Sequence, residues 1–490
     1  MMILWTNVPL IKRQPAEPLT KWTSPLIVHD NVRLPAAARE TSCAGASHPE
    51  SGSSRSRWCA PAPGHDPAAT AAQAGDHHRA YKKVGYFIQW GIYGRGFFVK
   101  NLVTSGAAAK LTHVNYAFAN VSEDGRCFEA NLAGEGDAWA DYQRPASAAE
   151  GVDGVADSPD QALKGNFNQL RKLKARYPDL KVLLSIGGWT WSTFFSNAAL
   201  TSASRKAFVA SCIDLFIKGN LPQLGSIEGG PGSAAGVFDG IDLDWEWPAS
   251  EGEPGNVVRP EDRRNFTLLL AEFRRQLDAY GRKTGRHHQL TAFLPADPAQ
   301  MDAGFEGRRI FRYLDFATVQ GYDFHGTWES TTNHQSAIRV PEGQPLLPDF
   351  TVERAIGGWI ERGAPSSKLV LGLPFYGRGW TGVTGGGDGL FQPAAGPAPG
   401  TFEAGYEDYH RLATLPASGF RLYRDDRAGF AWLFDGSTFW TFDDPAVMRL
   451  KTAYIKRNGL AGAMVWSLDG DDANGTLVDT IHRGLRGGGG

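Results

Sequence analysis

The sequence predicts an α/β fold, a (β/α)8 TIM barrel with a small α+β insertion between strand 7 and helix 7 of the barrel. Two observations carry this prediction. Eight short apolar runs alternate with amphipathic stretches, and a segment rich in Gly and aromatic residues interrupts this alternation after the seventh run. The eight runs cover residues 84–88, 111–118, 181–188, 238–246, 289–295, 316–323, 369–375 and 462–468.

Stretches with helical periodicity lie between the runs, at residues 167–177, 205–218, 262–281 and 446–459. The third of these stretches is the clearest. Its apolar residues recur along one stripe of a helix, at Phe266, Leu269, Leu270, Phe273 and Leu277. Gly281 follows this stripe, so we expect the helix to end there.

The domain organisation follows from breaks in this pattern. Residues 380–443 hold short β-like pieces, which predicts the insertion, and we expect Trp432 and Trp440 to lie in its core. Residues 1–80 contain nine prolines and no sustained periodicity, so we expect a disordered leader or linker before a barrel at 81–484. Residues 485–490 read as a flexible Gly tail.

Composition excludes several classes of partner. The 50 Lys and Arg against 52 Asp and Glu leave a formal charge of −2, which provides no basic field for nucleic acid or an anionic membrane. No stretch of 18 apolar residues is present, and no signal peptide is readable at the start. We expect a monomer without a nucleic-acid or membrane partner.

The four cysteines (Cys43, Cys59, Cys127 and Cys212) lack the spacing of a metal or redox motif. We therefore expect no metal and no cofactor, and at most one or two disulfides. The 15 tryptophans exceed what a core needs. Because indole rings stack on flat apolar ligands, and sugar rings are common among these, this excess favours a carbohydrate ligand.

The most informative segment is DGIDLDWEWP, which begins at Asp239. Side chains of a strand alternate between its faces, so Asp242, Asp244 and Glu246 share one side. Barrel interiors are normally apolar, and active sites of barrels lie at the carboxyl ends of strands, where Pro248 places Glu246. Crowded buried carboxylates raise one another's pKa, and a Glu with a raised pKa is suited to general acid catalysis.

Two other interpretations of this segment compete. One is a solvent-facing strand with alternating charge, which the apolar run and the flanking glycines disfavour. The other is a divalent cation site, which the absence of His and of further ordered carboxylate spacing disfavours. Acid catalysis is the interpretation that we favour.

At these residues the sequence resembles glycoside hydrolase family 18, the chitinases. DGIDLDWE is similar to the family's D-x-x-D-x-D-x-E signature, and KVLLSIGGW (181–189) is similar to its S-x-G-G strand. VGYFIQWGIYGR (84–95) resembles bacterial, particularly actinobacterial, members. The resemblance extends from Tyr81 to about Asp479 and implies a TIM-barrel catalytic domain.

The resemblance implies a role for each acid. Glu246 would protonate the glycosidic oxygen while the 2-acetamido carbonyl of the sugar attacks the anomeric carbon, and Glu246 would then activate water. Asp244 would bind and orient the acetamide N–H, and Asp242 would share a proton with Asp244. Asp239, with Gly240, would be a structural part of the motif.

The resemblance also implies substrate contacts. In VQGYDFHG (319–326), Tyr322 would donate to the acetamide carbonyl and Asp323 would bind near the cleavage point; the family usually has Met where Gln320 stands, which puts the packing beneath the sugar in doubt. Core packing is the alternative for each single Trp. The further substrate-binding residues are Tyr86, Trp90, Phe118, Gly188, Trp189, Trp247, Trp328, Tyr376, Arg378 and Trp466.

These expectations amount to an extracellular chitinase that hydrolyses β-1,4 linkages of chitin and chitooligosaccharides with retention, without a cofactor. A non-catalytic chitin-binding lectin is one alternative, which the presence of Glu246 disfavours. An endo-β-N-acetylglucosaminidase acting on N-glycans is another, and the insertion disfavours it because in chitinases it walls one side of the substrate cleft.

Overall fold

The computed structural model describes residues 80–345 and 349–486. The leader expected at 1–80 lies outside the described residues except for its last position, and so do residues 487–490 of the expected tail.

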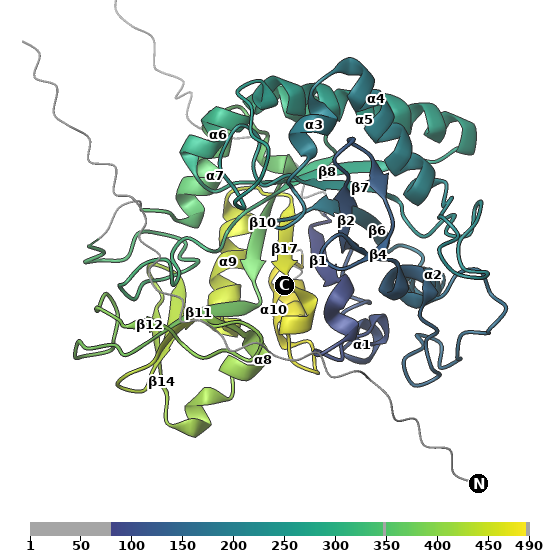
Figure 1. Ribbon diagram of the computed structural model, residues 1–490. Helices are drawn as coiled ribbons and strands as arrows, with labels where there is room; N and C mark the ends of the chain where they lie inside the picture. The colour runs from purple at the N-terminus through teal and green to yellow at the C-terminus, as the bar shows by residue number, and fades with distance from the viewer. Residues whose placement is uncertain (1–79, 346–348, 487–490) are drawn as a thin grey trace, which may run out of the picture. The chain divides into compact units, whose positions relative to one another are not determined.

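Eight parallel strands form the closed barrel (Figure 1). Their order is β1-β17-β10-β9-β8-β7-β6-β2, and β1 pairs with β2 to close the ring. Each strand overlaps one predicted run, although β7 and β9 are markedly shorter than expected. The strands are β1 (Lys82–Ile88), β2 (His113–Val121), β6 (Lys181–Gly187), β7 (Gly240–Asp244), β8 (Gln289–Leu294), β9 (Phe316–Val319), β10 (Leu369–Pro374) and β17 (Gly462–Trp466).

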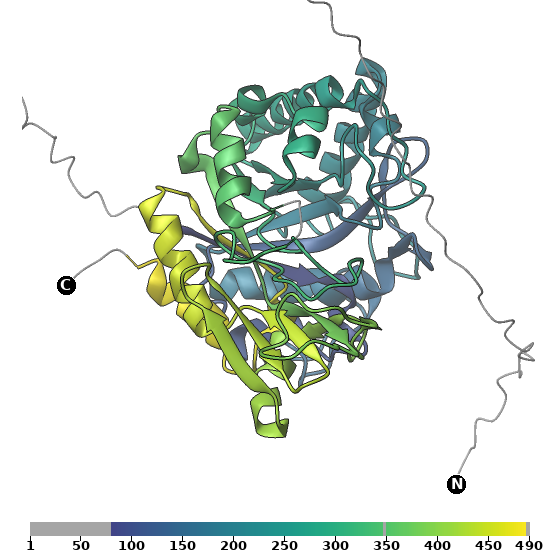
Figure 2. The same cartoon turned by 90° about the vertical axis from the view of Figure 1, so that its left-hand side faces the viewer.

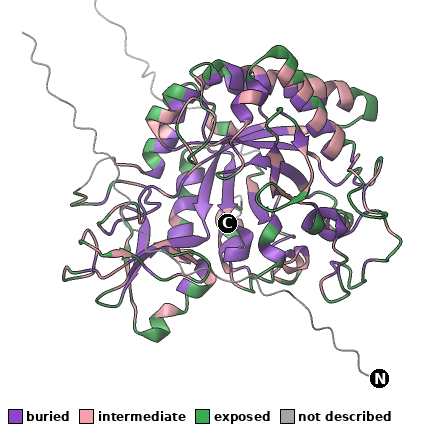
Figure 3. Cartoon of the chain, viewed as in Figure 1, coloured by how far each residue is buried: buried purple, intermediate pink, exposed green. Residues whose placement is uncertain are grey.

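Helices follow the strands and cover the outside of the barrel; α9 and α10 pack side by side (yellow in Figure 2). Figure 3 shows that the strands are buried, whereas the helices expose their outer faces. No helix in the described part of the chain has the length and hydrophobicity that crossing a membrane requires. The main helices are α1 (Val99–Thr104), α2 (Gly165–Arg176), α4 (Ser202–Cys212), α5 (Asp262–Thr284), α6 (Pro298–Gly304), α7 (Val352–Glu361), α9 (Pro445–Arg457) and α10 (Thr476–Gly484).

The predicted end of α5 is wrong. The helix continues past Gly281 to Thr284, and Gly285 ends it in the left-handed conformation, with φ 68°. Gly281 serves a different purpose, because a Cβ there would lie 2.4 Å from the carbonyl oxygen of Arg286. The predicted apolar stripe is buried along its whole length.

An inserted unit at residues 376–442 separates β10 from α9, so it begins slightly earlier than expected. Its sheet has the order β12-β11-β16-β15-β14, and β13 also pairs with β11. Trp432 and Trp440 are buried, as expected. The elements are β11 (Tyr376–Thr381), β12 (Gly396–Pro397), β13 (Tyr406–Asp408), α8 (Tyr409–Leu412), β14 (Arg421–Asp425), β15 (Phe430–Phe434) and β16 (Phe439–Phe442).

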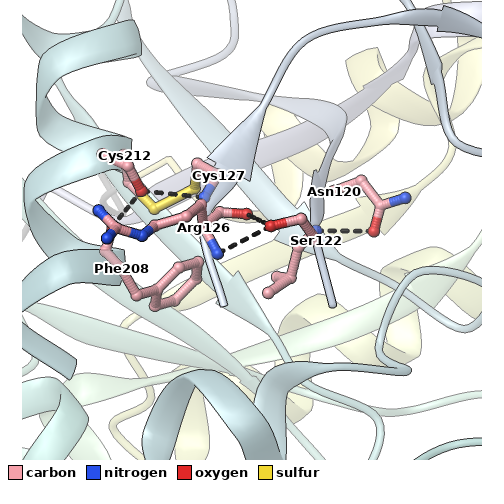
Figure 4. Close-up of a disulfide and its surroundings, with 8 residues drawn as sticks. Asn120, Ser122, Arg126, Cys127, Phe208 and Cys212 are labelled. Atoms are coloured by element: carbon pink, nitrogen blue, oxygen red, sulfur yellow. Dashed lines mark hydrogen bonds between the residues drawn. A yellow bond between two sulfur atoms is a disulfide. The ribbon is translucent and has the colours of Figure 1, made fainter. Parts of the chain in front are cut away.

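A disulfide joins two elements on the outside of the barrel (Figure 4). Cys127, in the short strand β3 (Cys127–Phe128), is bonded to Cys212 at the end of α4, with their Cα atoms 5.1 Å apart. The backbone N–H of Cys127 also donates to the Ser211 hydroxyl at 2.9 Å. The bridge therefore fixes the β2–β3 hairpin against α4. Three further small elements are present. The strands β4 (Asn131–Leu132) and β5 (Gly136–Asp137) precede α2, and the helix α3 (Phe195–Ala199) precedes α4.

Candidate active site

The acids of β7 alternate as the sequence predicts. Ile241 and Leu243 are fully buried on the outer face of the strand, whereas Asp242 and Asp244 are buried inside the barrel. Glu246 lies two residues beyond the strand end and is half-buried. The three carboxyl groups therefore rise along the inside of the barrel toward its carboxyl-terminal rim, where barrel active sites lie.

The start of the motif is held separately from these acids. Oδ2 of Asp239 accepts from the Val182 N–H at 2.9 Å and pairs with Lys174 Nζ at 2.9 Å. A Cβ on Gly240 would lie 2.3 Å from the Gln289 carbonyl oxygen, so glycine permits the close approach of β8. Both residues lie at the opposite end of β7 from Glu246 and brace the strand.

Asp242 is surrounded by hydroxyl donors. Its Oδ2 accepts from Tyr86 at 2.7 Å and from Ser185 at 2.8 Å, and its Oδ1 accepts from Thr291. Burial raises the pKa of Asp242, and these three hydrogen bonds oppose the rise. Because of these hydrogen bonds, the ionised form of Asp242 is less unfavourable than it would be if the carboxylate were buried without donors.

Asp244 lacks comparable donors. Its Oδ1 is buried and has no hydrogen-bond partner among the described residues. Burial, followed by the neighbouring charges of Glu246 and Asp242, raises the pKa of Asp244 well above its usual range. Asp244 therefore retains an oxygen that can accept a hydrogen bond from a ligand.

Glu246 has the environment of a proton donor. Burial, and secondarily the negative charge of Asp323, raises the pKa of Glu246 to about 8. Its backbone N–H donates to the Ser192 hydroxyl at 2.9 Å, and that hydroxyl donates to the Gly188 carbonyl at 2.8 Å. The loop after β6 thus fixes the backbone from which a carboxyl group, protonated at neutral pH, projects.

The two glycines at the end of β6, Gly187 and Gly188, are required for steric reasons. A Cβ on Gly187 would lie 2.3 Å from the Asp244 carbonyl oxygen, and one on Gly188 would lie 2.6 Å from the ring of Phe118. Both glycines also have positive φ, 106° and 74°. The S-x-G-G motif therefore lets the end of β6 lie against the acids and against Phe118.

Tyr322 and Asp323 follow the end of β9. The Tyr322 ring is buried, stacks on Phe293 with centroids 6.2 Å apart, and meets Tyr376 edge-on. Burial and then the charges of Asp244 and Glu246 raise the pKa of Tyr322 far above its usual range, so it remains a hydroxyl donor. Asp323 adopts a left-handed backbone conformation, with φ 57°.

The inserted unit contributes one wall of this region. Arg378 of β11 donates from Nε to Oδ1 of Asp323 at 2.8 Å. Its guanidinium lies 5.4 to 5.5 Å from the ring centroids of Trp328, Tyr376 and Tyr406. The rings of Tyr376 and Tyr406 stack with centroids 4.5 Å apart. An ion pair thus ties the insertion to the end of β9.

A second aromatic group comes from the other side of the barrel. Trp466, at the end of β17, meets Tyr86 edge-on at 5.2 Å and stacks on Phe118 at 5.6 Å. Trp90, just after β1, lies 6.5 Å from Trp466. Four of the predicted substrate-binding residues are therefore brought together, and Tyr86 connects them to Asp242.

The remaining predicted residues differ in accessibility. Trp90, Trp189 and Trp328 are 42%, 49% and 59% exposed, so each has ring surface free for a ligand. Trp247 is buried and stacks on Phe293 at 5.5 Å. Gln320 is half-buried and accepts the Ala296 N–H through Oε1 at 3.3 Å.

Sequence reasoning missed Thr291, Ser192 and Tyr406. A signal for Thr291 was present, since it is a polar residue at an inward position of the apolar run QLTAFL. Ser192 and Tyr406 lie in a loop and in the insertion, where no periodicity marks them. Among residues 80–345 and 349–486, no three His, Cys, Asp or Glu side chains form a group that could hold a metal ion.

The fold and the site together define the class of protein. It is a closed (β/α)8 barrel with a row of acidic side chains at the carboxyl end of one strand. The chain matches the model of the family Glycosyl hydrolases family 18 over residues 82–471 and belongs to that family.

Individual relatives are consistent with this membership. The chain is 40% identical over 410 residues to Chitinase 63 of Streptomyces plicatus, and the match covers 82% of this chain and 60% of that protein. It is 34% identical to Chitinase 1 of Aphanocladium album, and this match covers 82% of this chain and 84% of that protein. It is similar in structure to the catalytic domain of the psychrophilic chitinase B from Arthrobacter TAD20, with a TM-score of 0.80, 47% identity, and coverage of 83% and 95%. The chain thus spans about three fifths of the length of the Streptomyces relative.

Proposed function

We propose that the protein is a chitinase that hydrolyses β-1,4 linkages of chitin and chitooligosaccharides. The observation that carries this proposal is the pairing of Glu246, whose pKa is raised to about 8, with Asp244, which has a buried oxygen without a partner among the described residues. The first is a proton donor for a leaving oxygen, and the second is an acceptor for the N–H of a 2-acetamido group.

The reaction proceeds with the substrate's own acetamide as nucleophile. Glu246 protonates the glycosidic oxygen, the acetamide carbonyl oxygen attacks the anomeric carbon, and the leaving sugar departs with the proton. Asp244 accepts a hydrogen bond from the acetamide N–H and offsets the positive charge of the oxazolinium ion. Glu246, now a carboxylate, removes a proton from the water that opens this ion, which regenerates the acid and retains the configuration.

Two further residues support the same step. Tyr322 is a buried hydroxyl beside Asp244 and Glu246, and it donates to the acetamide carbonyl oxygen. Asp242 accepts three hydroxyl hydrogen bonds and exchanges a proton with Asp244 as charge develops. These roles explain why Asp242, Asp244 and Glu246 face the inside of the barrel, where apolar side chains are usual.

The aromatic residues bind the polymer. Trp466 forms the floor beneath the reacting sugar, with Tyr86 and Phe118 around it, and the exposed indoles of Trp90 and Trp189 stack on further sugars. The remaining contacts come from the exposed Trp328, the buried Trp247, the Asp323–Arg378 pair, Tyr376, Gln320 and the backbone of Gly188.

Product analysis tests the substrate and the stereochemistry together. The protein should cleave a soluble chitohexaose and release β-anomeric products first, as observed by proton NMR. Release of an N-glycan from a glycoprotein without cleavage of chitohexaose would favour the endo-β-N-acetylglucosaminidase instead. Initial release of the α-anomer would contradict the acetamide mechanism.

We further infer that the protein acts outside the cell. The Cys127–Cys212 bridge supports this inference, since disulfides persist in oxidising compartments. Activity should accumulate in the culture medium of the producing organism, and retention of all activity within the cells would contradict it.

A further inference from the structure

The turn that carries Trp328 is closed by His325. The backbone N–H of Glu329 donates to the Gly326 carbonyl at 2.9 Å, and Nδ1 of His325 lies 2.8 Å from the Glu329 carboxylate. Between them, the Trp328 indole packs directly on the backbone of Gly326, because a Cβ there would lie 2.2 Å from the ring. The position of this exposed indole therefore depends on the His325–Glu329 contact.

A hydrogen-bonded chain continues from the other nitrogen of His325. The amide nitrogen of Gln344 lies 3.2 Å from Nε2 of His325, and its Oε1 lies 3.2 Å from Nε2 of His334. At the far end, the backbone N–H of Ala337 donates to Nδ1 of His334 at 3.3 Å. Four side chains thus join the Trp328 turn to a backbone donor.

The Ala337 N–H fixes the direction of every bond in this chain. Because Nδ1 of His334 accepts, its Nε2 carries the proton and donates to Gln344 Oε1. The Gln344 amide then donates to Nε2 of His325, so Nδ1 of His325 carries the proton and donates to Glu329. All donors and acceptors match only when both imidazoles are neutral.

The surroundings favour the neutral state of the second imidazole. His325 and His334 are both fully buried. Burial lowers the pKa of His334 well below its usual range. The charged groups nearby are the Glu329 carboxylate and, on the side of α9, Lys451, which is paired with Asp443.

We propose that His325 is a positioning residue that presents the Trp328 indole to the substrate, with its orientation fixed by the neutral chain through Gln344 and His334. This inference rests on the proposed function only in naming a chitooligosaccharide as the ligand of Trp328. The positioning itself is a property of the free protein and is tested separately.

Two substitutions of His325 separate its two contacts. The amide nitrogen of Asn lies near Nδ1 of the imidazole it replaces, and that of Gln lies near Nε2. H325N should therefore keep the donor to Glu329, whereas H325Q should lose it. His287 is a matched control, since its Nε2 pairs with Asp315 Oδ1 at 2.7 Å outside the site.

The first readout needs no substrate. In protein labelled with 5-fluorotryptophan, the Trp328 resonance is assigned by its loss in W328F. H325Q should shift or broaden this resonance, whereas H325N and H287Q should leave it in place. An unchanged Trp328 resonance in folded H325Q would overturn the proposal, whether or not the protein cleaves chitin.

The second readout is a double-mutant cycle on chitohexaose hydrolysis. W328A and H325Q should each raise KM about tenfold with kcat within about twofold, and the double variant should be no worse than W328A alone. Independent effects that multiply in the double variant would show that His325 does not act through Trp328. No hydrolysis by the wild type would contradict the proposed function and leave the fluorine result to decide the positioning.

Discussion

The Tyr86 hydroxyl lies 2.7 Å from Oδ2 of Asp242, and this bond crosses the inside of the barrel from β1 to β7. It connects two parts of the site, because the same tyrosine ring packs edge-on against Trp466. The residue that binds the first acid of the row is therefore also a neighbour of the proposed sugar floor.

Removing this hydroxyl should impair catalysis more than stability. In Y86F, Asp242 loses one of the hydrogen bonds that oppose the rise of its pKa, and it also loses the bond that fixes its carboxyl group for proton exchange with Asp244. We expect kcat on chitohexaose to fall about tenfold, measured with substrate in excess. Y116F is the matched control, since Tyr116 donates to the buried Asp141 on the outer face of β2. An equal loss of kcat in both variants would contradict the assigned role.

The pH dependence should report the raised pKa of Glu246. The reaction needs the protonated acid, so kcat/KM should fall as the pH rises above about 8. Asp323 contributes to this raised pKa after burial, so D323N should lower it and move the alkaline limb to lower pH. D302N, which removes an exposed carboxylate paired with Arg362, should not move the limb. An unchanged limb in D323N would refute the electrostatic coupling.

The buried carboxyl group of Asp244 should lower the free energy of unfolding at neutral pH. Its pKa in the folded protein is raised by burial, Glu246 and Asp242, so the folded state binds more protons than the unfolded chain above the ordinary Asp pKa. Stability should therefore fall as the pH rises through this range, and D244N should remove that dependence. We expect D244N to be about 1 to 2 kcal/mol more stable at pH 7 while losing activity, as measured by urea unfolding.

The control for this measurement is D239N. Asp239 accepts a backbone hydrogen bond and pairs with Lys174, so its replacement should lower the free energy of unfolding. A lower free energy of unfolding in D244N at pH 7 would show that the buried carboxyl group of Asp244 does not destabilise the folded protein.

The disulfide should contribute mainly to stability. The bridge closes a loop with a sequence separation of 85 residues, so replacing Cys127 and Cys212 by Ser should lower the free energy of unfolding by roughly 2 to 5 kcal/mol. Denaturant melts of the oxidised wild type and the double variant measure this difference. S211A, which loses only the hydroxyl beside Cys127, should have a smaller effect. Identical denaturant melts for the wild type and the double variant would contradict the claim that this disulfide stabilises the protein.

The barrel was predictable because each strand is an apolar run bounded by breaks. The same logic failed at Gly281, because a glycine inside a helix can serve a close backbone contact instead of ending the helix. Strand alternation correctly placed Asp242 and Asp244 inside, since a period of two needs no tertiary information.

Contacts between distant segments could not be predicted in this way. The stacking of Tyr406 on Tyr376, the pairing of Cys127 with Cys212, and the chain from His325 to His334 join residues whose spacing follows no secondary-structure period. They depend on how loops and the insertion fold back on the barrel.

The most direct test of the account is the hydrolysis of chitohexaose by the wild type and by E246Q. An amide of the same shape cannot supply the proton that the leaving oxygen needs, so turnover in E246Q should fall by a factor of about 100 to 10,000 while binding of the oligosaccharide persists. Equal turnover by the two proteins, or no turnover by either, would contradict the assignment of Glu246 as the catalytic acid of a chitinase.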